Sequence, residues 1–443
     1  MIPLYPKFPF IRIPGTYVSV RLEDFFLLIV TLVFGIYFFK ELPKLLKNQL
    51  EFSVVAFILT GCLSLISGIF LTQTVNPSLG FLSWLRRVEY FVPLAVGIFY
   101  FKRNGVKDLE FFVKVIVMTI LVAFVYGFGQ KHFSWPVIIT QNEEYAKGAA
   151  LRWLPGSHIN STFAGHYDLA TFLVFLLPLV VSYYFLLKGF WSKFFLAITF
   201  FAGLWLLANA VSRISVFSYL LATTISLILL KKYKVSLVVV VVSLVFFSFS
   251  GALLARYTNI LEVTYQKLKP RFKLMQNLPS PVVYAVEESS LTKRVNQVNL
   301  IPPESTSVFE DRSMSIRLNV EWPRALRAFT KNPLLGTGYS SITLATDNDF
   351  LRLLGEVGIF GFVAFILVLR NLLVLIKRSV SRLSKLSLIE SAFVAGYIGG
   401  FTGVVVNSLF IDIFEASKLA IIFWLISGLF VSLVRNRLYG KNI

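Results

Sequence analysis

The stretch Val235–Ala255 reads VSLVVVVVSLVFFSFSGALLA and contains no charged residue. Its length matches the about 20 apolar residues that a helix needs to cross the hydrocarbon core of a bilayer. The whole chain has the same character, because 56% of its 443 residues are hydrophobic and only 15% are charged. Soluble domains are roughly 45–50% apolar and about 25% charged. The sequence therefore predicts a membrane protein and excludes the soluble enzyme folds.

Ten further segments resemble this stretch in length and apolar content. The eleven candidate membrane helices cover residues 23–39, 52–71, 86–101, 110–128, 167–187, 193–211, 213–230, 235–255, 353–375, 390–410 and 417–434. We therefore predict an all-α, polytopic membrane protein with about eleven transmembrane helices. Residues 1–255 would hold helices one to eight, residues 256–350 a long segment outside the membrane, and residues 351–443 helices nine to eleven.

The positive charges indicate how these helices are oriented. The chain has 43 Lys and Arg against 23 Asp and Glu, a formal net charge of +20. Basic connections fall at alternate ends of the helices, at residues 40–47, 102–107, 188–193, 231–234 and 377–385. Short cytoplasmic loops of membrane proteins are enriched in Lys and Arg. The charge excess thus reports membrane orientation, and we expect no nucleic acid as a partner.

The segment 256–350 is predicted to lie outside the cytoplasmic membrane. Loops longer than about 12 to 15 residues are usually functional or disordered. Two amphipathic stretches, 261–273 and 317–329, predict short helices that lie on the outer face of the helix bundle and cover a site there.

Ionisable residues that are costly in lipid gather at the predicted outer ends of the helices. These are Arg86, Arg87, Glu89, His166, Asp168, Arg213, Asp347, Asp349 and Glu356. Such residues mark functional sites in membrane proteins, although each alone is also explained by a structural ion pair or by a side chain that reaches the headgroups. The single Cys62 and the spacing of the three His residues predict no metal site. The run Asp347–Asp349 is equally compatible with a helix cap.

The stretch Arg317–Phe362 reads RLNVEWPRALRAFTKNPLLGTGYSSITLATDNDFLRLLGEVGIFGF. It resembles the signature of the bacterial O-antigen ligase and O-antigen polymerase superfamily. The matching residues are Arg317, Trp322, Pro333 to Gly336, Gly338, Asn348, Glu356, Gly358 and Gly361. Two upstream pieces are also similar to the family, namely Ser212-Arg213 and Arg152 followed by STFAGHYDLATFL. The family commonly has His before the Asn, where this chain has Asp347.

The resemblance implies a bacterial inner-membrane enzyme of cell-envelope polysaccharide biosynthesis whose active site faces outward. It would transfer a glycan from a polyprenyl diphosphate, such as undecaprenyl diphosphate, to a sugar acceptor and so polymerise an O-antigen-like polysaccharide. The alternative within the family is a ligase that transfers the glycan to lipid A core, giving lipopolysaccharide, or to protein. An alternative from another class is a transporter or flippase for lipid-linked sugars. Membrane lipids, a chain-length regulator and a flippase are the expected further partners.

The chemistry of this transfer suggests roles for individual residues. The leaving diphosphate needs fixed cations, and Arg binds two phosphate oxygens at once, so Arg213 and Arg317 are expected to bind it and to replace a metal or other cofactor. A carboxylate must accept the proton of the attacking hydroxyl, and we assign this role to Asp347, with His166 and Glu356 as alternatives. The expected substrate-binding residues are Arg152, His166, Arg86, Arg87, Trp322, Tyr339, Asn348 and Glu356.

Overall fold

The computed structural model of the protein describes residues 2–5, 9–12, 19–104, 107–138, 151–251, 253–254, 257–258, 312–343 and 345–439. Most of the predicted outer segment 256–350, including the amphipathic stretch 261–273, lies outside the described residues. The second amphipathic stretch, 317–329, is described and is helical.

Each of the eleven predicted segments contains a helix in the described part of the chain. The helices are α1 (Leu22–Leu45), α2 (Gln49–Phe70), α3 (Pro77–Asn104), α4 (Lys107–His132), α6 (His166–Leu186), α7 (Phe190–Ala210), α8 (Arg213–Leu229), α9 (Tyr233–Ser248), α13 (Asp349–Val380), α14 (Leu388–Ser408) and α15 (Ser417–Tyr439). The shorter elements are η1 (Ile2–Leu4), β1 (Pro9–Arg12), β2 (Ser19–Arg21), α11 (Arg312–Ile316), η2 (Arg317–Glu321), α12 (Trp322–Lys331) and η3 (Leu383–Lys385). The antiparallel pair β1–β2 is a small departure from the predicted all-α fold.

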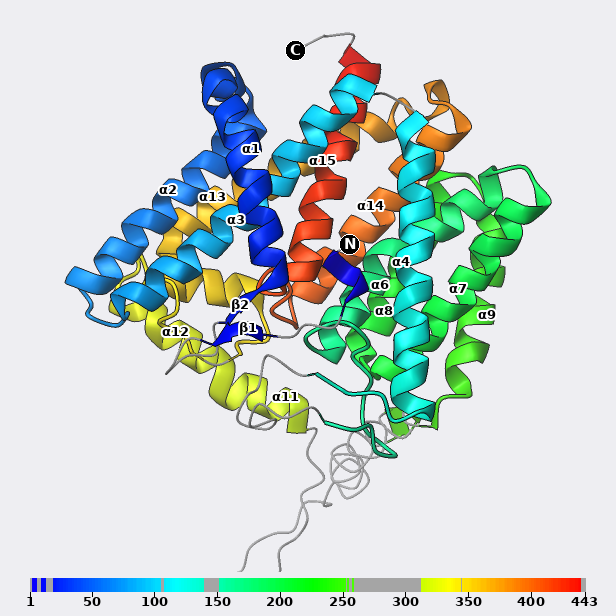
Figure 1. Ribbon diagram of the computed structural model, residues 1–443, viewed down its shortest axis with the longest axis horizontal. Helices are drawn as coiled ribbons and strands as arrows, with labels where there is room; N and C mark the ends of the chain where they lie inside the picture. The colour runs from blue at the N-terminus through cyan, green and yellow to red at the C-terminus, as the bar shows by residue number, and fades with distance from the viewer. Residues whose placement is uncertain are drawn as a thin grey trace, which may run out of the picture.

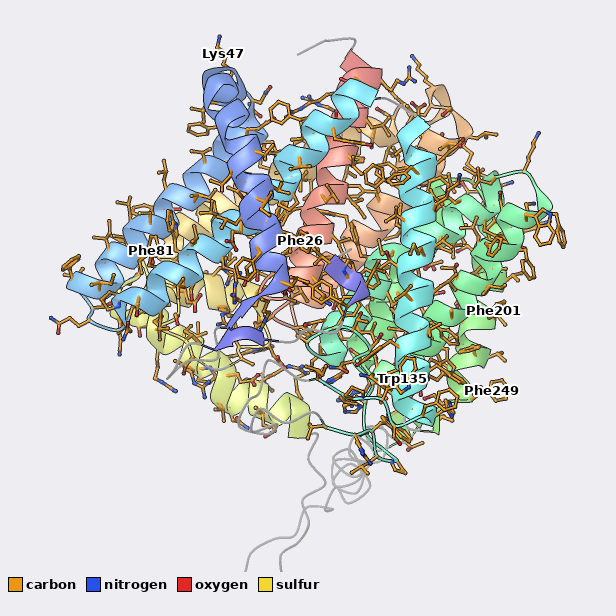
Figure 2. The ribbon with its side chains drawn as sticks, viewed as in Figure 1. Phe26, Lys47, Phe81, Trp135, Phe201 and Phe249 are labelled. Carbon is orange, nitrogen blue, oxygen red and sulfur yellow. The ribbon has the colours of Figure 1, made fainter. Side chains whose placement is uncertain are left out.

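Seven helices of the described chain are long and apolar enough to cross a membrane, and α8 and α9 are shorter apolar helices. Large apolar side chains project outward from the bundle, among them Phe26, Phe81, Phe201 and Phe249 (Figure 2). Such a surface is suited to lipid and not to water. The chain is therefore an integral membrane protein.

The helices form two groups that meet at α14 and α15 (Figure 1). Helices α1, α2, α3 and α13 lie on one side, and α4 with α6 to α9 on the other. The closest pairs are α15 with α3 and α14 with α6, which join the two groups into one bundle. The short helices α11 and α12 lie across one end, together with β1 and β2, and the C-terminus lies at the opposite end (Figure 1).

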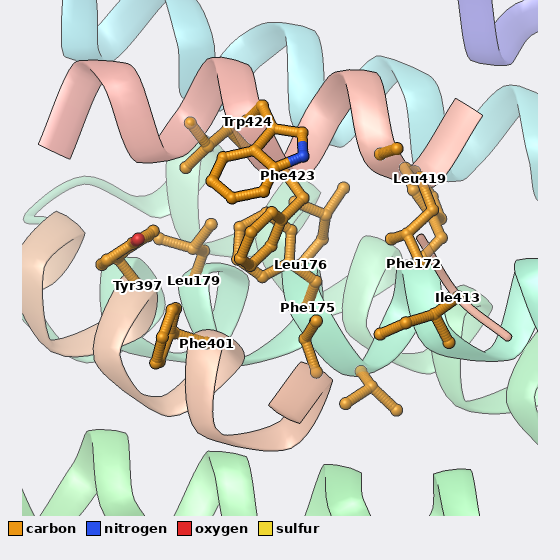
Figure 3. Close-up of a cluster of buried hydrophobic side chains, with 14 of the residues drawn as sticks. Phe172, Phe175, Leu176, Leu179, Tyr397, Phe401, Ile413, Leu419, Phe423 and Trp424 are labelled. Carbon is orange, nitrogen blue, oxygen red and sulfur yellow. The ribbon is translucent and has the colours of Figure 1, made fainter. Parts of the chain in front are cut away.

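Small residues allow α14 and α15 to approach their neighbours closely. A Cβ atom at Gly400 of α14 would lie 2.4 Å from the Phe175 carbonyl oxygen, and one at Gly428 of α15 would lie 2.2 Å from the Leu94 carbonyl oxygen. Close backbone contact through small residues is the usual mode of helix packing in membranes. Around these contacts a buried aromatic cluster fills the interior, with Phe175, Phe423 and Trp424 at its centre (Figure 3).

Two predicted helix boundaries were wrong. The helix over 86–101 begins nine residues earlier, at Pro77, so Arg86 and Arg87 lie inside α3 and not at its start. The helix accommodates them because carboxylates from other elements pair with both. The stretch 235–255 is not one helix, because α9 ends at Ser248; the Ser248 hydroxyl donates to its own helix at the Val245 carbonyl, and Gly251 follows soon after.

Candidate active site

Arg317 lies on a widened turn between two short helices. The turn η2 is a π-helix, in which the Trp322 N–H donates to the Arg317 carbonyl five residues back. Pro323 favours this turn because it has no N–H to donate to the carbonyl four residues before it. The Arg317 side chain is directed into the protein, and the residue is only 7% exposed. Single π-helical turns occur frequently at functional sites.

Arg317 forms an ion pair with Asp347. Its Nη2 and Nε donate to the same oxygen, Oδ2, at 2.7 and 3.0 Å. The Tyr167 hydroxyl, at the start of α6, is a further hydrogen-bond partner of Arg317. Burial lowers the pKa of Arg317, but the charges and hydrogen bonds of Asp347 and Tyr167 together outweigh this effect and hold the pKa above its ordinary value. The guanidinium is therefore charged at every physiological pH.

Asp347 sits in a backbone conformation that its neighbours impose. Its φ of 50° is left-handed, a region that Asp tolerates better than most residues. The amides on both sides of it, those of Thr346 and Asn348, donate to the Asp412 carboxylate at 2.7 and 3.0 Å. Asp412 thus holds the turn from its inner side, and the Asp347 side chain is left to reach Arg317.

The turn is fixed reciprocally by the connection between α14 and α15. Asp349 accepts from the amides of Ile413 and Phe414 at 2.9 and 3.2 Å. The turn before α13 and the connection between α14 and α15 therefore each contribute a carboxylate that binds backbone amides of the other segment. Asn348 caps α13 by accepting from the Leu351 N–H at 2.9 Å, which confirms the helix-cap interpretation of the run Asp347–Asp349. We call this arrangement the clasp, consisting of residues 346–349 and 412–414.

A second carboxylate, Glu321, lies on the same turn as Arg317. Burial raises the pKa of Glu321 to about 7, and the negative charges of Asp347 and Asp412 add to this rise while Arg317 opposes it. Burial also raises the pKa of Asp347, against the effect of Arg317. Both carboxyl groups are therefore stronger bases than an ordinary Asp or Glu in water.

Several buried polar atoms around Glu321 have no hydrogen-bond partner among the described residues. They are Glu321 Oε2, Trp322 Nε1 and Arg324 Nη1. Leaving such an atom unpaired costs about 1–3 kcal/mol. Three of them on one turn, next to an Arg–Asp pair, form a place where a polar ligand would supply the missing bonds.

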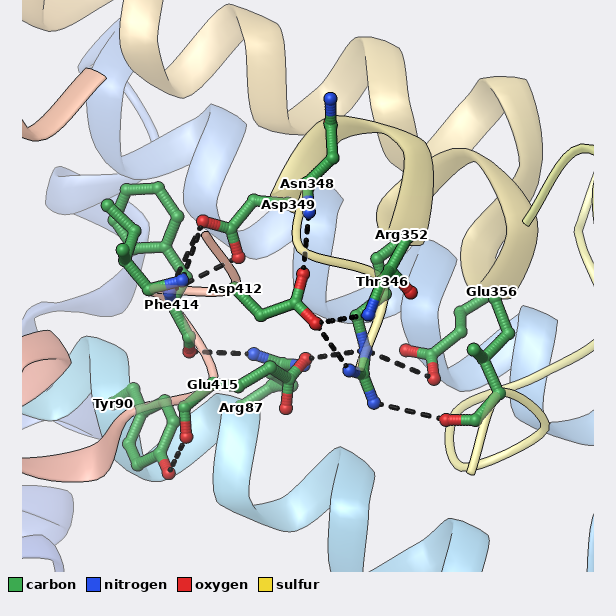
Figure 4. Close-up of polar contacts among 12 residues, drawn as sticks. Arg87, Tyr90, Thr346, Asn348, Asp349, Arg352, Glu356, Asp412, Phe414 and Glu415 are labelled. Atoms are coloured by element: carbon green, nitrogen blue, oxygen red, sulfur yellow. Dashed lines mark hydrogen bonds and ion pairs between the residues drawn. The ribbon is translucent and has the colours of Figure 1, made fainter. Parts of the chain in front are cut away.

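Behind the clasp lies a buried charge network (Figure 4). Arg352 of α13 donates to Asp412 at 3.0 Å, and its Nε lies 3.2 Å from Glu415 and 3.6 Å from Glu356. Arg87 of α3 pairs with Glu415 and donates to the Phe414 carbonyl at 2.8 Å. Of the predicted residues, Arg87 thus contacts the connection between α14 and α15, and Glu356 lies next to Arg352.

Arg86 belongs to a different cluster, formed with the N-terminal part of the chain. It lies 3.5 Å from Asp24 at the start of α1. The neighbouring Glu23 accepts from the Tyr5 hydroxyl at 2.6 Å and from the Ser417 hydroxyl at 3.0 Å. Lys418 donates to the Thr162 carbonyl at 2.7 Å in the same region. This cluster explains Arg86 as a structural ion pair.

The remaining predicted contacts are spread over the same end of the bundle. Arg213 is the first residue of α8, where its charge acts on the Tyr257 hydroxyl. Arg152 is exposed on the connection between α4 and α6. His166 opens α6 and lies between the rings of His158 and Tyr167, with centroids at 4.4 and 4.1 Å. Through Tyr167 this stack reaches Arg317.

Trp322 and Tyr339 differ in their surroundings. Trp322 begins α12 next to Glu321 and is half-buried. Tyr339 is 1% exposed and packs against the backbone of Gly61, with Arg87 5.6 Å from its ring centroid. Tyr339 is therefore packed in the interior, whereas Trp322 lies on the turn that follows Arg317.

The sequence reasoning did not identify Glu321, Tyr167, Arg352 or Asp412. A signal for Glu321 was present, because it follows Arg317 by four residues in RLNVE. Asp412 and Glu415 lie in a short connection between two apolar segments, where acidic residues stand out. Among the described residues, no group of three or more His, Cys, Asp or Glu side chains is arranged to hold a metal ion.

Residues 198–366 match the model of the O-antigen ligase family. This part of the chain belongs to the O-antigen ligase and polymerase superfamily. The match includes Arg213, Arg317, Asp347 and Glu356 and ends before Asp412. The chain matches none of the curated proteins. The match over residues 198–366 and the apolar helices together indicate a multi-pass membrane protein of polysaccharide biosynthesis.

Proposed function

We propose that this protein is a polyprenyl-diphosphate-dependent glycosyltransferase that polymerises an O-antigen-like polysaccharide on the outer side of the bacterial inner membrane. The observation that carries the proposal is the buried Arg317–Asp347 pair, bordered by the unpartnered polar atoms of Glu321, Trp322 and Arg324. It combines a permanent cation with two carboxylates of raised pKa, which is what transfer from a diphosphate to a hydroxyl requires.

Arg317 binds the diphosphate of the donor in this mechanism. The bond between the anomeric carbon and the diphosphate oxygen breaks, and the developing negative charge stays on that oxygen. A guanidinium in a desolvated site stabilises this charge far better than it would in water. In this proposal Arg213 and Arg152, on the same end of the bundle, act on the remaining phosphate and glycan oxygens.

Asp347 accepts the proton of the attacking acceptor hydroxyl. Arg317 occupies only Oδ2, so Oδ1 is the oxygen to which the proton passes, and the Asp347 side chain is 21% exposed. The acceptor oxygen then bonds to the anomeric carbon, and the lipid diphosphate leaves. Glu321 is the second carboxylate at this place, and its negative charge makes Asp347 a stronger base. Trp322 is placed to contact a sugar ring.

The distribution of basic residues supports an outward-facing site. Lys47 and the C-terminus lie at the end of the bundle opposite α11 and α12 (Figures 1 and 2). The positive-inside rule assigns this basic end to the cytoplasm. Arg317 and Asp347 would then face the compartment in which lipid-linked glycans are extended.

A transfer assay on the purified protein tests the proposal. With a polyprenyl-diphosphate oligosaccharide as the only substrate, we expect a ladder of products on a gel, and we expect Asp347→Asn to lose it. A single shifted product that forms only when lipid A core or a protein acceptor is added would identify a ligase. Movement of the lipid between leaflets without any glycosidic product would contradict the transferase and favour a flippase.

The pH dependence of transfer tests the role of Glu321. Its carboxyl is mostly protonated below a pKa of about 7 and mostly ionised above it. Since the ionised form strengthens Asp347 as a base, we expect the transfer rate to rise by up to about tenfold between pH 6 and pH 8. Glu321→Gln should be slower and lose this rise. If Glu321→Gln abolishes transfer while Asp347→Asn retains it, the base is Glu321 instead.

A further inference from the structure

A long apolar groove opens between α4 and the α6–α7 hairpin, far from Arg317. It has a volume of about 760 Å³, and residues of α4 from Glu110 to Val125 line one of its walls. At 1.5 Å per residue this wall is about 22 Å long, the length of an extended acyl chain. The opposite wall includes Tyr183 and Trp191. Tyr183 lies near the other end of α6 from Tyr167, so the groove is distinct from the candidate active site.

The groove is charged at one end only. Lys114 and Lys188 line it there together with Glu110, and the wall between Val117 and Val125 is apolar. Both lysines are exposed side chains at the rim of the groove. Two lysines against one glutamate leave this rim with an excess of positive charge. The rim also lies at the basic end of the bundle, next to the connection 188–193.

A buried hydroxyl on the groove wall has no partner. Tyr183 is 1% exposed, and its Oη forms no hydrogen bond with any described residue. Tyr183 lies about one helical turn before Leu187 and Lys188, which also line the groove, so it belongs to the charged end. A buried phenol normally finds an acceptor. Along the groove, the hydroxyl lies between the lysines and the apolar wall. In a phospholipid, the ester carbonyl lies in the same way between the phosphate and the acyl chain.

We propose that this groove binds one anionic phospholipid of the cytoplasmic leaflet. Lys114 and Lys188 bind its phosphate, the Tyr183 hydroxyl donates to an ester carbonyl, and one acyl chain lies along α4. The order of the three features, cation, hydroxyl and apolar wall, is the order of polarity within a phospholipid. The lipid would fasten α4 to the α6–α7 hairpin and so support α6, whose first turn carries Tyr167.

Native mass spectrometry of the purified protein with added dioleoyl phosphatidylglycerol tests this site. We expect one retained lipid, and we expect the Lys114→Gln, Lys188→Gln double variant to bind it about tenfold more weakly. Leu121→Trp should block the groove and remove the bound lipid. The matched controls are Lys232→Gln, on another basic connection, and Leu237→Trp, on the outward face of α9; both should bind like the unchanged protein.

Three results would overturn the proposal. Equal binding of phosphatidylglycerol by the lysine double variant would remove the phosphate site. Equal retention of diacylglycerol, which has no phosphate, would reduce the groove to an unspecific apolar contact. Tighter retention of a polyprenyl phosphate than of phosphatidylglycerol would assign the groove to the donor lipid. Tyr183→Phe is a further variant, which should keep the fold and weaken the retention of phosphatidylglycerol.

Discussion

Replacing Arg317 by Ala lowers the rate of glycan transfer by about 10²- to 10³-fold, because the developing charge on the leaving diphosphate loses its nearest fixed cation. The same change leaves Asp347 as a half-buried carboxylate without its partner. Arg317→Lys should recover only a small part of the activity, since an ammonium cannot make both hydrogen bonds of the guanidinium. The measurement is single-turnover transfer by the purified protein from a labelled polyprenyl-diphosphate oligosaccharide.

The control for this prediction is Arg327→Ala. Arg327 lies on α12 in the same amphipathic stretch, but it is exposed. Its loss should change the transfer rate by less than about twofold, as for other surface substitutions. A similar loss of activity in both variants would show that transfer depends on the overall positive charge of the stretch 317–329 and not on Arg317 in particular. Full activity of Arg317→Ala would remove Arg317 from the mechanism.

Arg352→Met destabilises the protein by about 3–5 kcal/mol, the range found when one partner of a buried ion pair is removed. Arg352 is the cation that Asp412, Glu415 and Glu356 share, and its side chain is 16% exposed. Without it, three carboxylates face each other in a region of low dielectric. The measurement is the thermal unfolding midpoint in detergent, followed by intrinsic fluorescence, with transfer activity measured on the same samples.

Two further variants test whether the loss of stability comes from the buried network or from the removal of any arginine on a membrane helix. Arg370→Met changes the same residue type on the same helix, but Arg370 is exposed on α13, so its midpoint should hardly move. Adding Glu356→Gln to Arg352→Met should restore part of the stability, because it removes one of the unbalanced negative charges and leaves the Asp412 carboxylate on its two amides. If Arg352→Met and Arg370→Met unfold at the same temperature, the buried network does not hold the clasp.

The membrane character and the order of the helices could be predicted from the sequence with little error. Apolar runs of about 20 residues are a local signal, and each of the eleven runs contains a helix of the described chain, of which seven are long and apolar enough to cross a membrane. The boundaries failed where charge was involved. Arg86 and Arg87 suggested a helix start, whereas α3 contains them in its interior because Asp24 and Glu415 neutralise them there.

The candidate site could be predicted only in part. The residue types of Arg317 and Asp347 pointed to diphosphate and proton chemistry, and they are paired in the structure. Arg86, Arg87, Tyr339 and Glu356 were predicted at the same site, and in the structure they contact Asp24, Glu415, Gly61 and Arg352, respectively. Glu321 was missed because its raised pKa depends on burial and on Asp412, which is distant in sequence.

The sequence by itself determined the membrane character of this protein, the order of its helices and its resemblance to a family, because these follow from composition, local periodicity and short motifs. Only the tertiary structure decided which charges meet. Asp347 faces Arg317 because Asp412, in the connection between α14 and α15, binds the amides on both sides of it. An ion pair depends on distance and burial, and both are set by the packing of helices that are far apart in the chain.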